Sequence, residues 1–200
     1  MQKSFVIQVQ EHVLALLTSR TPFQNYYHDV AHTKEVVAAA TEIGKGEQLN
    51  DGELEIIQIA AWFHDAGYIE KTLGHEKISE RIAKDFLNSV KYPSVKIQKV
   101  SSCIKSTKVP QKPKNKLEKI ICDADLSHLG LVTFFERNDK YRIEFENYLG
   151  QKMDDEKWLK KSISFMKRHR FFTKYALKNY SAQKKLNLQI LQSQLKLLSH

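Results

Sequence analysis

The sequence predicts an all-α fold, a single-domain helical bundle of about eight to ten helices. Apolar residues recur at spacings of three and four along almost the whole chain, as in helices that bury one face. Glycines, prolines and capping residues separate these segments, and no segment combines strand-like alternation with a hairpin turn. The 200 residues can bury the core of one domain, so we expect a single domain over 1–200.

Turn and capping residues place the boundaries of the expected helices. The pair Thr21-Pro22 precedes the second helix, and Asn50-Asp51-Gly52-Glu53 has the pattern of a capping box at the start of the third. Tyr92-Pro93 separates the fourth helix from the fifth. Two prolines and three lysines in 109–116 predict a loop before the sixth. In chain order, the expected helices span about 3–18, 28–44, 52–66, 75–90, 94–107, 116–129, 131–149, 154–168 and 181–198.

The net charge of +9 is concentrated in the last quarter of the chain. Residues 151–200 hold 12 Lys and Arg against 3 Asp and Glu, whereas residues 1–150 hold equal numbers of each sign. The basic residues alternate with Leu and Phe at helical spacing, which favours solvated helix faces over a site for an acidic partner. We therefore interpret about 131–200 as a basic helical extension of a core at about 22–130.

Composition also indicates where the protein resides. No run of 18 apolar residues exists, so we expect no membrane span, and polar residues interrupt the N-terminal segment where a signal peptide would be apolar. Cys103 and Cys122 lie among apolar neighbours and form no Cys-x-x-Cys pair, which predicts buried free thiols rather than a zinc site. These features favour a cytoplasmic protein.

Ionisable residues occupy positions on apolar stripes where core residues are expected. His64 continues the helical series of Leu54, Ile57 and Ala61, and Asp65 lies about 100° further round the helix. On the helix at 28–44, the stripe that contains Val36 leads back to His32 and, one turn earlier, to His28.

The helix at 116–129 repeats this pattern. Its stripe includes Leu117, Ile121 and Leu129, and Asp125 fills the position between the last two. A single buried His or Asp is usually a hydrogen-bonded structural residue. Two histidines and two aspartates that converge from three helices instead suggest the ligands of a divalent cation, which would offset the cost of burying both carboxylates.

These residues resemble the H…HD…D signature of the HD-domain superfamily of metal-dependent phosphohydrolases. The segment YHDVAH (27–32) is similar to H-N-x-x-H of the cyclic nucleotide phosphodiesterases, and CDADLSHLG (122–130) is similar to their A-D-L-S-N segment. The second likeness selects Asp125 rather than Asp123 as the metal ligand. Helical geometry agrees, because the two aspartates point about 160° apart.

The sequence more closely resembles small bacterial HD proteins of predicted phosphohydrolase activity. Their Y-H-x-x-x-H, A-W-F-H-D-A, T-K and D-A-D-L-x-x-L-G segments match residues 27–32, 61–66, 107–108 and 123–130. Similar segments continue at YRIEFENY (141–148), Trp158 and RHRFF (168–172), so the likeness covers about 22–195. Two departures are that Asp29 replaces the Asn of the phosphodiesterase segment and that His75 stands where the closer group has Asn.

The resemblance implies a helical domain of the HD type that binds one divalent ion, which these ligands would accept as Mn, Mg, Fe, Co, Ni or Zn. The implied reaction is hydrolysis of a phosphoester or phosphoanhydride, in a small phosphorylated substrate such as a nucleotide, through a metal-activated water. The expected metal ligands are His32, His64, Asp65 and Asp125.

Further roles follow from position along the helices. Asp65 or Asp123 would orient the water, and His28 is the candidate general acid for the leaving oxygen. The candidates for substrate binding are Lys105, Lys108, His75 and Glu76.

The remaining histidines are not expected to take part in this site. His12, His169 and His200 lack ionisable neighbours of this kind and are expected to face solvent.

Two other functions are considered for this sequence. A dinuclear iron oxygenase would need further histidines, of which only His75 is near. A non-catalytic module that holds a metal and binds nucleic acid or another acidic partner through its basic C-terminal surface is the alternative. The sequence leaves the oligomeric state open and is compatible with a homodimer.

Overall fold

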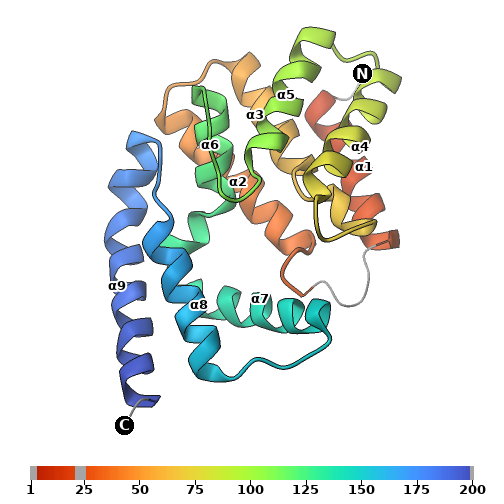
Figure 1. Ribbon diagram of the computed structural model, residues 1–200. Coiled ribbons are helices and arrows are strands. Elements are labelled where there is room, and N and C mark those ends of the chain that lie inside the picture. The colour runs from red at the N-terminus through yellow and green to blue at the C-terminus, as the bar shows by residue number, and fades with distance from the viewer. Residues whose placement is uncertain (1–3, 21–25, 199–200) are drawn as a thin grey trace. The chain divides into compact units, whose positions relative to one another are not determined.

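The computed structural model describes residues 4–20 and 26–198 of the chain (Figure 1). Within these residues the chain forms nine α-helices, two short 3-10 helices and no strand, which confirms the predicted all-α fold. The α-helices are α1 (Phe5–Arg20), α2 (Val30–Gly46), α3 (Asp51–Phe63), α4 (His75–Ser89), α5 (Ser94–Ser106), α6 (Lys116–Asp125), α7 (Phe134–Leu149), α8 (Asp155–Arg168) and α9 (Lys174–Leu198). The 3-10 helices are η1 (Ala66–Ile69) and η2 (Ser127–Gly130).

The start of α2 differs from the predicted start at residue 28. The side chain of Asp29 accepts a hydrogen bond of 2.7 Å from the backbone N of His32, so Asp29 caps the helix and Val30 is its first residue. His28 therefore precedes the helix. The prediction that His28 lies on this helix, one turn before His32, is wrong.

The predicted helices at 52–66 and 116–129 both extend too far. In the structure α3 ends at Phe63 and α6 ends at Asp125, and a 3-10 helix follows each of them. The last helix begins at Lys174 rather than at residue 181, because the Thr173 hydroxyl accepts a hydrogen bond from the backbone N of Ala176 and caps it.

The described residues form two compact units, and the first unit contains residues 4–20 and 28–125. In this unit α2 packs against α3 and α6, and α4 packs against α5 and η1. α3 packs against α1, α2, α5 and α6, and its side chains Ile57, Ile59 and Phe63 are fully buried. α3 is therefore the central helix of this unit, and burial of its apolar side chains supplies the main driving force for folding. The predicted free thiols are confirmed, because Cys103 and Cys122 are both buried and unpaired in disulfides.

The second unit contains residues 26–27 and 126–198, and α9 packs along α8 and η2. Gly130 permits this contact, since a Cβ atom built there would lie 2.5 Å from the Cβ of Tyr180 on α9. The amide of Asn187, also on α9, donates hydrogen bonds to the backbone oxygens of Leu129 (3.0 Å) and Leu131 (2.9 Å). Residues 126–131 are thus fixed to α9 by both packing and hydrogen bonds. The prediction of one domain over 1–200 stays a prediction.

Two histidines expected at the surface are partly buried. The ring of His12 stacks on Phe86, with ring centroids 4.1 Å apart, and His169 contacts Phe171 edge-on at 4.8 Å. The prediction that His12 and His169 face solvent is wrong, because each ring packs against an aromatic neighbour. His200 lies outside the described residues. In the parts of the chain that the structure describes, no helix is both long and apolar enough to cross a membrane.

Candidate metal centre

Three helices of the first unit place the four candidate ligands. His32 lies in the first turn of α2, where Asp29 fixes the backbone by its cap. His64 and Asp65 directly follow the last residue of the apolar helix α3, and Asp125 is the last residue of α6. Because α2 packs against both α3 and α6, these helix ends meet inside the unit.

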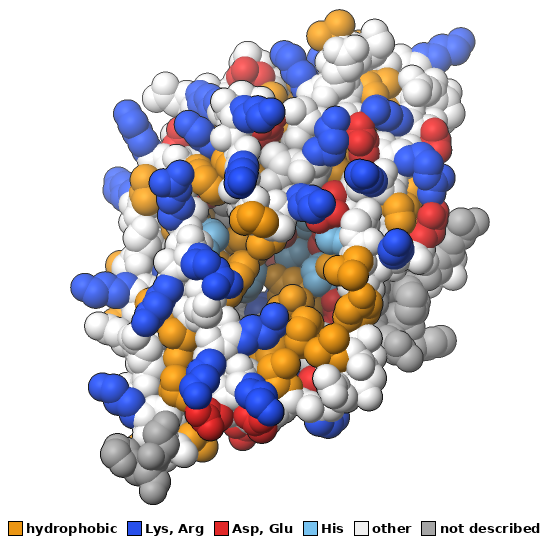
Figure 2. Space-filling view, in the orientation of Figure 1, with side chains coloured by type: hydrophobic (Ala, Val, Ile, Leu, Met, Phe, Trp, Pro, Cys, Tyr) orange, Lys and Arg blue, Asp and Glu red, His pale blue; other side chains and the backbone are white. Residues whose placement is uncertain are grey.

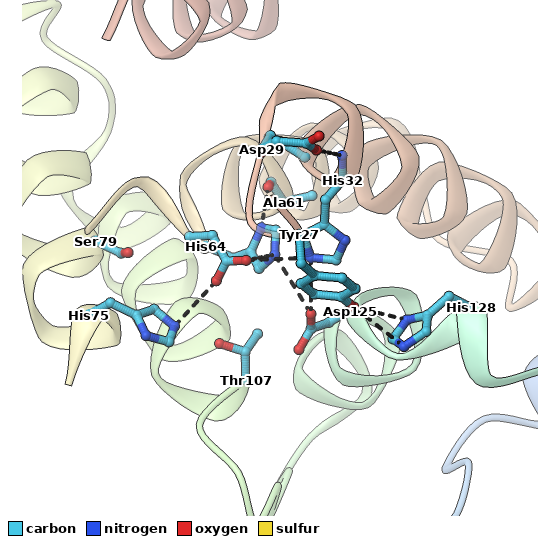
Figure 3. A network of polar contacts seen from close by, with 12 residues as sticks. Tyr27, Asp29, His32, Ala61, His64, His75, Ser79, Thr107, Asp125 and His128 are labelled. Carbon is cyan, nitrogen blue, oxygen red and sulfur yellow. Dashed lines mark hydrogen bonds and ion pairs between the residues drawn. The ribbon is translucent and has the colours of Figure 1, made fainter. Parts of the chain in front are cut away.

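The four side chains converge on one point, and Figure 3 shows those of His32, His64 and Asp125 directed toward one another. One ligand atom from each of them lies within 4.8 Å of the others. The Nε2 atom of His32 lies 3.4 Å from Oδ2 of Asp65 and 3.6 Å from Oδ1 of Asp125. The side chains of His32 and His64 are almost wholly buried. In the space-filling view, basic side chains are numerous on the surface and few histidines are visible (Figure 2).

The hydrogen bonds of His64 test whether these residues fit a metal ion. Its Nδ1–H donates to the backbone oxygen of Ala61 at 2.7 Å, so in the neutral ring Nε2 carries the lone pair. That Nε2 lies 3.0 Å from Oδ2 of Asp65, yet among the described residues neither atom has a hydrogen-bond partner. Two buried electron-pair donors at this distance repel each other unless a cation lies between them. The arrangement therefore fits a divalent metal ion.

The electrostatics of the centre agree with this interpretation. Burial lowers the pKa of His32, but the carboxylates of Asp125 and Asp65 raise it by more, to about 9. Burial raises the pKa of Asp65, and the surrounding histidines lower it by more, to well below its usual range. The carboxylates thus favour positive charge on the neighbouring histidines. A metal ion would compete with protons for the histidine nitrogens and the carboxylate oxygens.

Each carboxylate also has an outer oxygen that faces a further side chain. Oδ1 of Asp65 lies 3.2 Å from Nε2 of His75, whose Nδ1–H donates to the backbone oxygen of Thr72 at 2.9 Å. Oδ2 of Asp125 accepts a hydrogen bond of 3.2 Å from Nε2 of Gln111. Loss of a residue that holds a metal ligand in this way typically weakens metal binding about 10- to 100-fold.

Two of the predicted catalytic residues, His28 and Asp123, are not members of the cluster of four side chains. The His28 ring stacks on Tyr68 with centroids 3.8 Å apart, and its centroid is 5.8 Å from that of His32. His28 is therefore a neighbour of the centre, although it precedes α2. Asp123 on α6 is fully buried and is not among the four clustered side chains.

The predicted substrate-binding residues fall into a buried pair and an exposed pair. His75 and Glu76 begin α4, with Nε2 of the first 4.0 Å from Oε1 of the second, and both are largely buried. Lys105 and Lys108 are exposed, and Lys105 forms an ion pair of 3.5 Å with Glu80. Of these four, His75 contacts a candidate metal ligand, since its Nε2 lies 3.2 Å from Oδ1 of Asp65.

Sequence reasoning missed Gln111 and the orienting contact of His75. Gln111 lies in a loop, where no periodicity marks a residue that points inward. For His75, the only signal was a departure from the pattern of similar proteins.

A known protein family matches the part of the chain that holds this centre. The family model of the HD domain matches residues 29–129, a range that contains all four clustered side chains. No curated protein sequence matches the chain at a significant level.

Solved structures of similar fold cover nearly the whole chain. A predicted HD superfamily hydrolase from an uncultured Thermotogales bacterium is 19% identical, with a TM-score of 0.64 over 93% of this chain and 91% of that one. Bacillus subtilis YpgQ, whose structure is a complex with ADP, is 19% identical, with a TM-score of 0.67 over 96% and 93%. A Lactobacillus plantarum protein is 15% identical, with a TM-score of 0.71 over 98% and 97%. At these identities the likeness shows a shared fold.

Proposed function

The chain belongs to the HD domain family, and from this membership and its His/Asp cluster we propose that it is a metal-dependent phosphohydrolase. The proposed reaction is cleavage of a phosphoester or phosphoanhydride, with a nucleotide as the preferred kind of substrate. One divalent ion, of the group Mn, Mg, Fe, Co, Ni and Zn, would be held by His32, His64, Asp65 and Asp125.

The observation that carries the proposal is the pair of buried lone-pair atoms at the centre. Nε2 of His64 and Oδ2 of Asp65 are both buried and lie 3.0 Å apart, a separation that needs a cation between them, either a proton or a metal ion. A divalent ion bound there would lower the pKa of a coordinated water and polarise a phosphate oxygen. The side chains of the protein would hold the ion in place and carry out the proton transfers.

We assign the proton transfers to residues beside the cluster. Asp65 is the better placed of the two aspartates to orient water, because it lies in the cluster while Asp123 is fully buried outside it. His28 would donate the proton to the leaving oxygen, since its ring lies next to that of His32 and is stacked on Tyr68.

A nucleotide substrate is supported by two observations. The structurally similar YpgQ of Bacillus subtilis was crystallised with ADP. In this chain, Lys105 and Lys108 are exposed at the end of α5, next to the loop whose Gln111 touches Asp125. Their ammonium groups would attract a phosphate chain as point charges, while the buried His75 and Glu76 would contact the substrate closer to the metal.

The test is hydrolysis of nucleoside mono-, di- and triphosphates with added Mn²⁺ or Mg²⁺. We compare the wild type with Asp125→Asn and with Asp85→Asn, which makes the same charge change on the exposed surface of α4. Loss of a ligand should lower kcat/KM by more than about 100-fold, because removing even a residue that orients a ligand costs about 10- to 100-fold. Metal-independent turnover, or equal rates in both variants, would refute the proposal.

A second candidate function rests on the charge of the C-terminal helices. No Asp or Glu follows Glu156, and Lys178, Lys185 and Lys196 are exposed along α9. A non-catalytic module would use this surface to bind nucleic acid. Binding to DNA or RNA that weakens steeply with salt, and that is lost when these three lysines are changed to Gln, would favour this function over hydrolysis.

A further inference from the structure

The two oxygens of Asp125 have different surroundings. Oδ1 faces the histidines of the cluster, at 3.6 Å from Nε2 of His32 and 3.7 Å from Nε2 of His64. Oδ2 points away from them and accepts the hydrogen bond of Gln111 at 3.2 Å. The carboxylate is therefore held with one oxygen directed at the metal position and the other directed at the loop.

The loop that follows α5 brings Gln111 into this contact. Its neighbours Lys112 and Lys114 are exposed, as polar loop residues usually are, whereas Gln111 is partly buried. Its Oε1 is shielded from solvent and has no hydrogen-bond partner among the described residues, so the Nε2 contact with Asp125 is what compensates the burial of the amide. Moving a side-chain amide out of water costs free energy unless it gains a hydrogen bond. For Gln111 the gain is a bond to a carboxylate, which is stronger than one between neutral groups.

We propose that Gln111 is a positioning residue that holds the metal ligand Asp125 by its outer oxygen. With Oδ2 fixed, the carboxylate presents Oδ1 alone to the ion, and rotation of the side chain no longer competes with ligation. Asp65 has a parallel arrangement, with His75 at its outer oxygen. This inference rests on the metal site of the proposed function, and it assigns to the loop after α5 a part in building that site.

The experiment measures metal affinity rather than turnover. The dissociation constant of Mn²⁺ is determined by electron paramagnetic resonance for the wild type, Gln111→Met, Gln111→Ala and Lys112→Met. Met keeps the approximate size of Gln without its amide, Ala makes no new contact, and Lys112→Met changes an exposed residue of the same loop. Thermal unfolding of each metal-free protein, followed by circular dichroism, reports any general loss of structure.

Both Gln111 variants should bind Mn²⁺ about 10- to 100-fold more weakly, while Lys112→Met matches the wild type. The metal-free proteins should unfold at similar temperatures, since the role of Gln111 is to orient a ligand. A Gln111→Met protein that binds Mn²⁺ within twofold of the wild type would overturn the inference alone. So would a loss of affinity that only parallels a loss of metal-free stability. A wild type that binds no Mn²⁺ would overturn the metal site itself and, with it, this inference.

Discussion

His169 provides a prediction about stability whose sign and size follow from its surroundings. The ring lies in the second unit against Phe171, and neither ring nitrogen has a hydrogen-bond partner among the described residues. Burial, together with the smaller effect of the Lys184 ammonium, lowers the pKa of His169 to about 3. The folded protein thus keeps this imidazole neutral at pH values where an unfolded chain, with an ordinary pKa of about 6.5, would protonate it.

The unfolded state binds the additional proton, so stability falls as the pH falls below about 6.5, and the loss continues down to the folded pKa of about 3. Above about pH 6.5 the ring is largely neutral in both the folded and the unfolded state, so His169 does not make the stability depend on pH. Each pH unit inside this window costs at most about 1.4 kcal/mol. Between pH 6.5 and pH 5 the limit is about 2 kcal/mol, and we expect about 1–2 kcal/mol because the ring is only partly buried.

Urea unfolding at pH 7.5, 6.5 and 5, followed by circular dichroism, checks this expectation. The wild type is compared with His169→Phe, which keeps an aromatic ring but cannot titrate. The difference in unfolding free energy between the two proteins should be constant from pH 7.5 to 6.5 and should move in favour of the variant by about 1–2 kcal/mol at pH 5. A difference that does not change with pH, or that moves in favour of the wild type on acidification, would refute the reasoning.

The remaining predictions concern the first unit and its centre. Gly67→Ala should destabilise the protein by about 1–3 kcal/mol in urea unfolding, because its Cβ would lie 2.2 Å from a backbone oxygen of α4; wild-type stability would contradict this. Asp29→Ala and Asp154→Ala each remove a helix N-cap and should each cost about 1 kcal/mol, but only the first should also weaken Mn²⁺ binding; equal binding by both would argue against a link between the α2 cap and the centre. Burial raises the pKa of both thiols, that of Cys103 to about 12, so Cys103 and Cys122 should react with a thiol reagent at pH 8 only after unfolding; rapid labelling of the native protein would contradict their burial.

Helical periodicity predicted much of the first unit and of its centre. His64 and Asp125 stood on apolar stripes, and the structure brings both side chains to one point with His32. Their convergence could be predicted because a position on a stripe is fixed by local geometry, so a polar residue there must point inward. The packing of α2 against α3 and α6 then determines that the stripes meet.

The parts that could not be predicted depend on side chains whose partners are distant in sequence. Gln111 is one of several polar residues in its loop, and only its 3.2 Å contact with Asp125 distinguishes it. The early start of α9 depends on the Thr173 cap, and a single threonine is a weak signal in a sequence. His28 was placed on α2 because its spacing suits the stripe, although the Asp29 cap begins the helix after it.

The measurement that tests the central claim most directly is the metal content per chain of gently purified protein, before and after reconstitution with Mn²⁺ or Mg²⁺. The wild type is compared with a His64→Ala, Asp65→Ala double variant, with circular dichroism to show that both are folded. We predict about one equivalent in the wild type and none in the double variant. No metal in the reconstituted wild type, or undiminished metal in the double variant, would contradict the account.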